Sequence, residues 1–188
     1  MNDFQGLIED SELSVLRAAY GERHRHYHTW THIETLLASA RRDVMATPAI
    51  LLAIAYHDVE YSATAKDNEA QSAKALFAAF QRKAVSADEA TVQRAMDMIN
   101  LGSGDAEADW FWDADREILA AAPDAYRAYG AAVRKEYKIY PGFMYRRGRK
   151  QFLQGELARP KIFRTDSFNA RFGDAARANI TAELSELG

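Results

Sequence analysis

The stretch "TPAILLAIAYHDVEY", residues 47–61, contains the most apolar segment of the chain. Thr47 followed by Pro48 is typical of a helix start, because proline at the first helical position sacrifices no hydrogen bond. The residues that follow are apolar on nearly every side of a helix, which indicates a helix buried at the centre of the protein. His57 and Asp58 stand near its end, where buried polar groups are costly unless they are paired or bound to a metal. The stretch therefore predicts a central helix and a candidate site at its end.

The rest of the chain has the helical period as well. Apolar residues recur at spacings of three and four, and no alternating segment is long enough to predict a strand. We expect an all-α, single-domain helical bundle of about eight or nine helices over residues 1–188. Its core should span roughly residues 20–120, with the C-terminal helices of roughly 123–188 packed on it. The expected helix starts are Ser11, Thr29, Thr47, Asp67 or Asn68, and a capping box of Ser86 and Glu89.

Composition limits the classes of function. Of the 188 residues 48% are apolar and 27% charged, which is the balance of a globular protein. The net charge of −3 predicts no DNA or RNA duplex and no membrane as a partner. The chain has no apolar run of transmembrane length and no signal-peptide pattern at its start, so the expected location is cytoplasmic. Because the chain lacks cysteine, any metal must be held by imidazole and carboxylate groups.

Four of the five histidines lie within nine residues of the stretch "YGERHRHYHTWTHIETLL", residues 20–37: His24, His26, His28 and His32. His28 and His32 are four residues apart and would share one face of a helix. Chance, a solvated polar turn and a metal site are three explanations of this crowding. A histidine pair of this spacing is more often a surface feature, so the metal explanation depends on further ligands elsewhere in the chain.

The stretch "WFWDADREIL", residues 110–119, supplies further carboxylates. Asp113 is placed to cap a following helix, and Asp115 would then lie in its first turn, where a carboxylate is favourable. Either residue could instead complete a metal site with the histidines. Two imidazoles and two carboxylates suit Mn, Fe, Co, Ni or Zn as divalent ions, and Mg is tolerable. The residues leave open whether Asp113 or Asp115 is the distal ligand.

At these residues the chain resembles the HD superfamily of metal-dependent phosphohydrolases, in particular a bacterial group known only as predicted phosphohydrolases. The resemblance extends over most of the chain, through "RHYHTWTHI", "AIAYHDVEY", "DNEAQSA", "WDADREIL", "VRKEY", "GRKQFL" and "ARANI". The superfamily pattern is a histidine, a later His–Asp pair and a distant aspartate. The resemblance therefore implies an HD-type helical fold and a divalent metal ion on His32, His57, Asp58 and Asp115.

The segment "YHTWTH" is also similar to a segment of cyclic-nucleotide phosphodiesterases, a branch of the same superfamily. That likeness implies that His28 donates a proton to the leaving group and that His32 binds the metal. Asp58 and Glu69 are the other residues expected in the catalytic set. The chain departs from two-metal members because it has no histidine after His57. One ion is therefore expected. Glu69 would either bind a second ion or orient a water, or it is simply a first-turn glutamate of a helix.

The implied function is hydrolysis of a phosphate ester by metal-activated water, with a small phosphorylated substrate for which nucleotides are one candidate. Arginine's planar fork suits phosphate oxygens, and Arg149 is the first choice for substrate binding, followed by Arg25 and Arg23. Two alternatives stay open. One is a metal- or nucleotide-binding regulatory module with little or no turnover. The other is a structural helical protein that acts through partner contacts and binds no metal.

Overall fold

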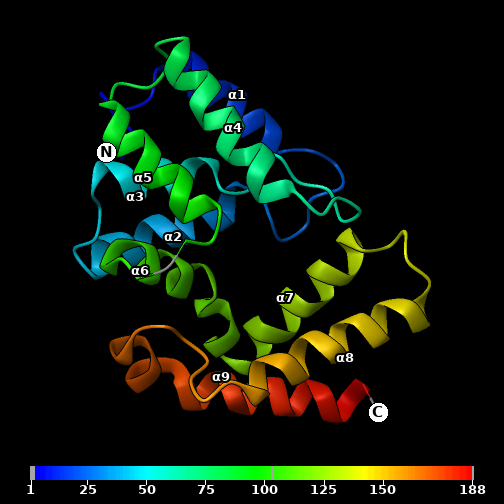
Figure 1. Cartoon of the computed structure of the whole chain (residues 1–188). Coiled ribbons are helices and arrows are strands. Elements are labelled where there is room, and N and C mark those ends of the chain that lie inside the picture. The colour runs from blue at the N-terminus through cyan, green and yellow to red at the C-terminus, as the bar shows by residue number, and fades with distance from the viewer. Residues whose placement is uncertain (1–2, 103, 188) are drawn as a thin grey trace. The chain divides into compact units, whose positions relative to one another are not determined.

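The protein is all-helical in the computed structural model, which describes residues 3–102 and 104–187. In these ranges nine α-helices and one short 3-10 helix are present, no strand is formed, and a single isolated bridge joins Ile8 and Val85 (Figure 1). The prediction of an all-α fold with eight or nine helices is thus confirmed. The helices are α1 (Asp10–Tyr20), α2 (Trp30–Arg42), α3 (Pro48–Tyr56), α4 (Asn68–Gln81), α5 (Glu89–Ile99), α6 (Ala106–Asp115), η1 (Glu117–Ala120), α7 (Pro123–Glu136), α8 (Gly142–Ala158) and α9 (Asp166–Leu187).

The chain divides into two compact units, Met1–Ala114 and Asp115–Gly188. The first unit contains α1 to α5 and α6 up to its last residue, and the second contains η1 and α7 to α9. The division falls close to the point where the sequence separates a core from its C-terminal helices. The packing of those helices on the core as one domain stays a prediction.

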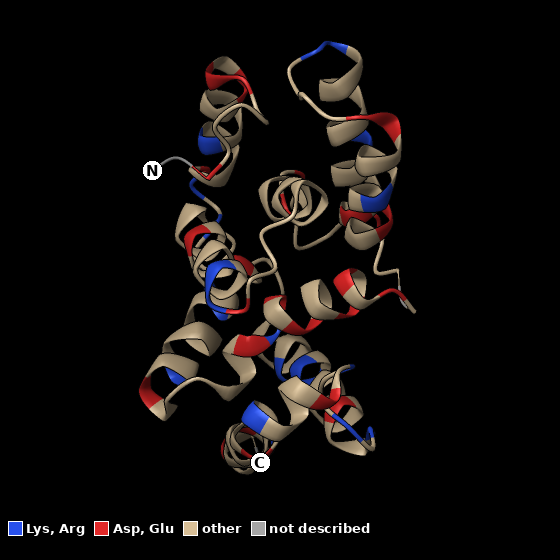
Figure 2. Cartoon of the chain, turned by 90° about the vertical axis from the view of Figure 1, so that its left-hand side faces the viewer, with Lys and Arg blue, Asp and Glu red and all other residues tan. Residues whose placement is uncertain are grey.

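Helix α3 is the centre of the first unit. The Thr47 hydroxyl accepts a hydrogen bond from the backbone N–H of Ile50 at 3.4 Å, and Pro48 is the first helical residue, as the sequence predicts. Seven of the nine residues of α3 are buried, and the helix packs against α2, α4 and α5. It contains no charged residue, whereas basic and acidic residues are spread over the other helices of the chain (Figure 2). An uncharged helix surrounded by others is the arrangement that its all-round apolar pattern predicts.

Two of the predicted helix starts are wrong. Helix α1 begins at Asp10 after Glu9, so Ser11 lies inside the helix and not at its cap. Helix α5 is capped by Asp88, whose carboxylate accepts a hydrogen bond from the N–H of Thr91 at 2.7 Å. The capping box predicted from Ser86 is therefore not formed, because the aspartate two residues later reaches the same free N–H groups.

The other starts are confirmed, with one change of role. Thr29 precedes α2, and Asp67 precedes α4, although neither side chain accepts from a backbone N–H of its helix. The Asp67 carboxylate instead accepts from the side-chain amide of Gln71 at 2.7 Å. Asn68, the first residue of α4, uses its side-chain amide on the preceding loop. Its Oδ1 accepts from the N–H of Ser62 at 3.0 Å, and its Nδ2 donates to the Ser62 carbonyl at 2.9 Å. This amide therefore ties the loop after α3 to the start of α4.

The helix end at the candidate site also differs from the expectation. Helix α3 stops at Tyr56, so His57 is its C-cap and Asp58 lies in the following turn. The backbone of His57 keeps helical angles, and its N–H still bonds to the carbonyl of Ala53, so the chain leaves the helix only after His57. At the other predicted stretch, Asp113 does not cap a helix; it lies within α6 with no exposed surface, and Asp115 is the last residue of that helix. The aromatic residues beside Asp113 favour a buried position for this part of the chain, and α6 continues past Asp113 to Asp115.

The second unit is held by a buried polar network between its helices. The Arg149 guanidinium of α8 donates to both carboxylate oxygens of Glu183 on α9, at 2.8 and 2.9 Å, and to the hydroxyl of Tyr129 at 3.3 Å. The Tyr126 hydroxyl of α7 donates to Glu183 at 2.5 Å. On α9, the Asn179 side-chain amide donates to the backbone carbonyl of Leu119, in η1, and to that of Ala121, which follows η1. The network ties α7, α8 and α9 together.

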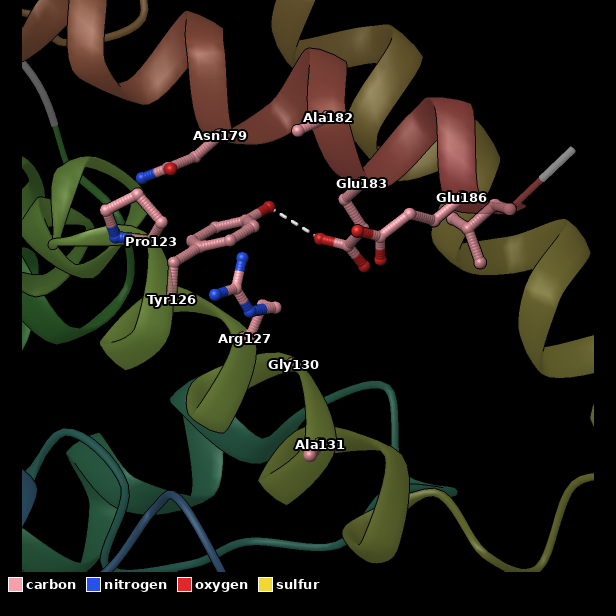
Figure 3. A pocket seen from close by; sticks show the side chains of 10 residues that line it. Pro123, Tyr126, Arg127, Gly130, Ala131, Asn179, Ala182, Glu183 and Glu186 are labelled. Atoms are coloured by element: carbon pink, nitrogen blue, oxygen red, sulfur yellow. Dashed lines mark hydrogen bonds between the residues drawn. The ribbon is translucent and has the colours of Figure 1, made fainter.

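A cavity of about 320 Å³ lies between α7 and α9 (Figure 3). Tyr126 and Glu183 line it, and their hydrogen bond crosses between the two helices. Because the Glu183 carboxylate already accepts from Tyr126 and Arg149, its acceptor capacity is largely used within the unit. The cavity is therefore a space beside a structural network, and we do not assign it a ligand.

Within residues 3–102 and 104–187, none of the helices combines the length and the apolar character that crossing a bilayer requires.

Candidate metal centre

Three of the predicted ligands meet at the C-terminal end of α3. His32 comes from the first turn of α2, and His57 and Asp58 follow α3 directly. Nε2 of His57 lies 3.1 Å from Nε2 of His32 and 3.0 Å from Oδ2 of Asp58, and one donor atom from each of the three lies within 4.8 Å of the others. Ligand atoms bound at about 2.0–2.2 Å to one ion, at angles between tetrahedral and octahedral, lie about 2.8–3.6 Å apart. The observed separations therefore match neighbouring ligands of a single ion.

The protonation of His57 is set by a backbone contact. Its Nδ1 lies 3.1 Å from the carbonyl oxygen of Ile54, which can only accept a hydrogen bond, so Nδ1 carries the proton. In the neutral ring Nε2 then presents a lone pair, and it faces an oxygen of the Asp58 carboxylate. A positive charge is needed between these two atoms, and either a second proton on the ring or a bound cation can supply it. A backbone carbonyl that accepts from the other ring nitrogen, and so fixes the tautomer, is the usual support of a metal-bound histidine.

Asp58 carries the negative charge of the cluster. Burial acts to raise the pKa of its carboxyl, but the neighbouring imidazoles of His57, His28 and His32 outweigh burial, and the pKa is lowered well below its usual range. The carboxylate is therefore ionised at neutral pH. His32 and His57 are 6% and 8% exposed, so the charge is concentrated in a largely dry pocket, where its attraction for a cation is strong.

His28 stands beside this cluster without belonging to it. Its Nε2 is 4.0 Å from Oδ2 of Asp58, and its ring stacks on Tyr61 with centroids 4.2 Å apart. Tyr27 meets the same ring edge-on at 5.0 Å. The side chain is partly exposed, unlike His32. His28 is thus held next to the site while keeping access to solvent, which is the position that a proton donor to a substrate requires.

Arg25 fastens the turn that carries the ligands. Its guanidinium donates to the carbonyl oxygens of Asp58 at 2.5 Å and Val59 at 2.8 Å, and its Nε donates to Glu22 at 3.0 Å. The side chain is almost fully buried, and its cationic end lies near the ring of Tyr61 at 5.5 Å. These donors are used on the protein's own backbone. The geometry therefore favours a supporting role, and the prediction that Arg25 binds substrate is not tested by it.

Tyr20 and Ser72 hold the same turn from other sides, and the sequence reasoning missed both. The Tyr20 hydroxyl donates to the carbonyl of Ala55 at 3.1 Å and accepts from the N–H of Asp58 at 3.3 Å. The fully buried Ser72 hydroxyl accepts from the N–H of Glu60 and donates to the carbonyl of the same residue. Ser72 lies in "DNEAQSA", so the family-like segment was the available signal; Tyr20 had none beyond its apolar spacing.

The remaining predicted site residues lie outside the three-residue group. Glu69 is an exposed residue in the first turn of α4, and Arg23 is exposed in the histidine-rich segment. Asp115 is the first residue of the second unit and is not among the grouped ligands found in the described part of the chain. The roles of these three residues stay predictions.

Arg149 lies inside the second unit. It is 7% exposed, and its bidentate contact with Glu183 has the geometry of a strong ion pair. Burial acts to lower the pKa of its guanidinium, but the bond to Glu183 outweighs burial and raises the pKa further. This arrangement favours a structural role for Arg149. Its predicted contact with substrate stays untested.

Comparisons of the chain with protein-family models, with curated proteins and with solved structures found no match.

Proposed function

We propose that this protein is a divalent-metal-dependent phosphohydrolase whose ion is held by His32, His57 and Asp58. The observation that carries the proposal is the convergence of three donor atoms at separations of 3.0 and 3.1 Å, with the His57 lone pair directed at a carboxylate oxygen. Such an arrangement is stable only with a positive charge between the groups. The likeness to HD-type phosphohydrolases supplies the reaction class, and Asp115 is its predicted fourth ligand.

The donor set fits the ion that this reaction requires. Two buried imidazoles and an ionised carboxylate suit Zn, Mn, Fe, Co or Ni more than Mg or Ca, which prefer oxygen ligands. Such an ion supplies a nucleophilic water at neutral pH and polarises a phosphoryl oxygen. The protein fixes the tautomer of His57 through Ile54 and holds the turn of Asp58 through Arg25. These residues keep the ligands in one geometry.

His28 is the proposed general acid for the leaving oxygen. The stacking on Tyr61 fixes its ring, and its Nε2 is the closest ring nitrogen to Asp58 outside the ligand group. Proton donation by a positioned side chain is typically worth about 10²–10⁴-fold in rate. His28→Ala should therefore slow hydrolysis by about that factor while the protein keeps its metal. An equal loss of metal would instead place His28 among the ligands.

The substrate is proposed to be a small phosphate ester, with nucleotides as one candidate. The partly exposed rings of Tyr27 and Tyr61 flank His28, and rings in this position can pack on a nucleobase. The exposed Arg23 lies nearby in the sequence and is the remaining candidate for a phosphate contact, since Arg25 is bonded to backbone carbonyls.

The testing experiment is elemental analysis of untagged protein, followed by hydrolysis assays. Wild type should contain about one divalent ion per chain and should cleave members of a panel of mononucleotides, cyclic nucleotides and generic phosphate esters with added Mn²⁺, Co²⁺, Ni²⁺ or Mg²⁺. His32→Ala should lose the ion, whereas His26→Ala, a change at an exposed histidine, should keep it. Stoichiometric metal without hydrolysis would indicate a binding module, and absence of metal from wild type would contradict the proposal.

A further inference from the structure

The turn between α7 and α8 exposes large apolar side chains. Ile139 lies in the connection and is 67% exposed, and Phe143 and Met144 in the first turn of α8 are 69% and 48% exposed. Residues 135–147, which we call the α7–α8 corner, follow the bend of the chain from α7 into α8 (Figure 1). Single exposed apolar residues are common on proteins, but three within six residues form a patch that suggests a binding surface.

The same corner is strongly cationic. Its exposed charged residues are all basic: Lys135, Lys138, Arg146 and Arg147. Between residues 125 and 155, all of which are described, the sequence contains one carboxylate, Glu136, and that residue is buried. The net charge of −3 is an average over the whole chain, whereas residues 125–155 contain no exposed carboxylate beside the four exposed cations of the corner.

One aromatic and two basic residues of α8 lie on one side of the helix. Phe143, Arg146 and Arg147 are related by spacings of three and four, so they share a helix face. The face that carries Arg149 and Leu153 is buried in the second unit. An outward strip that combines an aromatic residue with arginines is the composition of helices that lie in a membrane interface, where the ring enters the acyl boundary and the cations meet headgroups.

The corner is held in shape by its own contacts. Arg134 donates to the carbonyl oxygens of Tyr137 at 2.8 Å and Tyr140 at 3.2 Å, and its guanidinium lies over the ring of Tyr145 at 4.7 Å. Tyr137 also packs against the rings of Tyr140 and Tyr145. Because these contacts fix the connection, Ile139 is presented on a structured turn. A preorganised surface binds with a smaller entropy cost than a disordered loop.

We propose that the α7–α8 corner docks the protein on the surface of an anionic lipid bilayer. Four exposed cations in a segment that has no exposed carboxylate complement a negative surface, and three apolar side chains among them can enter the interface. A nucleic acid would use the cations but gives the aliphatic Ile139 and Met144 no matching site. The docking is peripheral, and it does not depend on the proposed metal chemistry.

The test is co-sedimentation of the full chain with lipid vesicles. Wild type is expected to bind vesicles of phosphatidylcholine containing about 30% phosphatidylserine, and to release at high salt, because screening weakens the headgroup contribution. Pure phosphatidylcholine vesicles should bind it weakly. Each basic residue near the surface contributes roughly a fivefold factor to the partition coefficient, so Arg146→Gln/Arg147→Gln should lower it about 25-fold.

Matched variants separate the two contributions. Phe143→Ser/Met144→Ser should weaken vesicle binding several-fold at unchanged charge, whereas Val15→Ser, which alters an exposed apolar residue of α1, should leave it unchanged. Lys74→Gln on α4 is the control for loss of a positive charge. The proposal is overturned if wild type does not distinguish the two vesicle types. It is also overturned if a single-stranded oligonucleotide binds through Arg146 and Arg147 while vesicles do not. Metal content and hydrolysis by the same variants should equal those of wild type, so the outcome is independent of the proposed catalytic function.

Discussion

Both units of this protein bury charged groups, but they neutralise them differently. In the second unit the Arg149 guanidinium forms a bidentate ion pair with the Glu183 carboxylate, and the Tyr126 hydroxyl donates a further hydrogen bond to the same carboxylate. In the first unit the carboxylate of Asp58 meets the imidazole nitrogen of His57, whose other nitrogen is already bonded to a carbonyl. The first arrangement is complete within the chain, whereas the second needs a positive charge at Nε2 of His57, which a second proton on the ring or a bound cation can supply. A buried charge alone therefore does not mark a functional site. A candidate site is indicated where a buried charged group faces a neighbour that does not neutralise it within the neutral chain.

The largest expected effect is a loss of stability when the Arg149–Glu183 ion pair is broken. Arg149→Met leaves Glu183 partly buried without its cation, and the free energy of unfolding should fall by about 3–5 kcal/mol. Denaturant titration measures the change, and Arg147→Met, at an exposed neighbour, is the matched control. The double variant Arg149→Met/Glu183→Leu should recover most of the loss, because no uncompensated charge remains. A small effect in the single variant would show that the pair is not the support of the second unit.

The next largest effect is expected on metal affinity, when Asp58 in the candidate metal centre is changed. Asp58→Asn removes the negative charge between the imidazoles and should weaken binding of Mn²⁺ or Co²⁺ by more than about 100-fold, the upper range for changes outside the ligand shell. Stability of the metal-free protein should change little, since the amide can accept or donate towards His57. Isothermal titration with the metal measures the first result, and Asp174→Asn, at an exposed carboxylate of α9, is the control. Unchanged metal affinity would remove Asp58 from the centre.

A smaller effect on metal affinity is expected when Arg25, which holds the turn of Asp58 and Val59, is changed. Arg25→Lys keeps the charge but cannot bond to both the Asp58 and Val59 carbonyls with a planar fork. Affinity for the metal should fall about 10–100-fold, as for other outer-shell changes. The neighbouring Arg23→Lys should leave it unchanged. If Arg25→Lys instead raised the KM for a phosphate ester at full metal occupancy, the predicted substrate contact would be favoured over the supporting role.

The smallest effect is a pH dependence of the second unit. Burial acts to raise the pKa of Glu183, but the bonds from Arg149 and Tyr126 outweigh it, and the pKa is lowered. A carboxyl with a lowered folded-state pKa stabilises the protein above its ordinary pKa, and this contribution is lost as pH falls through the folded value. Glu183→Gln should therefore show a flatter loss of unfolding free energy between pH 7 and acid conditions than wild type. Parallel curves for the two proteins would contradict the linkage.

Local patterns in the sequence were sufficient for the helical fold, and they singled out the three residues that the structure brings together in the candidate metal centre. The central α3 follows from its Thr–Pro start and its all-round apolar composition, and the helix starts at Thr29 and Asp67 follow from short-range chemistry. Where two capping residues stood close together, as with Ser86 and Asp88, the pattern chose the wrong one. The reason is that both can satisfy the same N–H groups, and the choice depends on how the chain enters the helix.

The amino-acid sequence by itself determined that the protein is all-α, that a buried helix lies at its centre, and that imidazole and carboxylate are the available metal ligands. These are consequences of periodicity and residue type, which act over a few residues. Only the tertiary structure decided that α3 ends before His57, that Arg25 is bonded to the turn that follows, and that Arg149 is paired with Glu183. The partners in these contacts lie 33 and 34 residues apart in the sequence. They come together only when the helices pack, so a pattern of a few neighbouring residues cannot predict the contact.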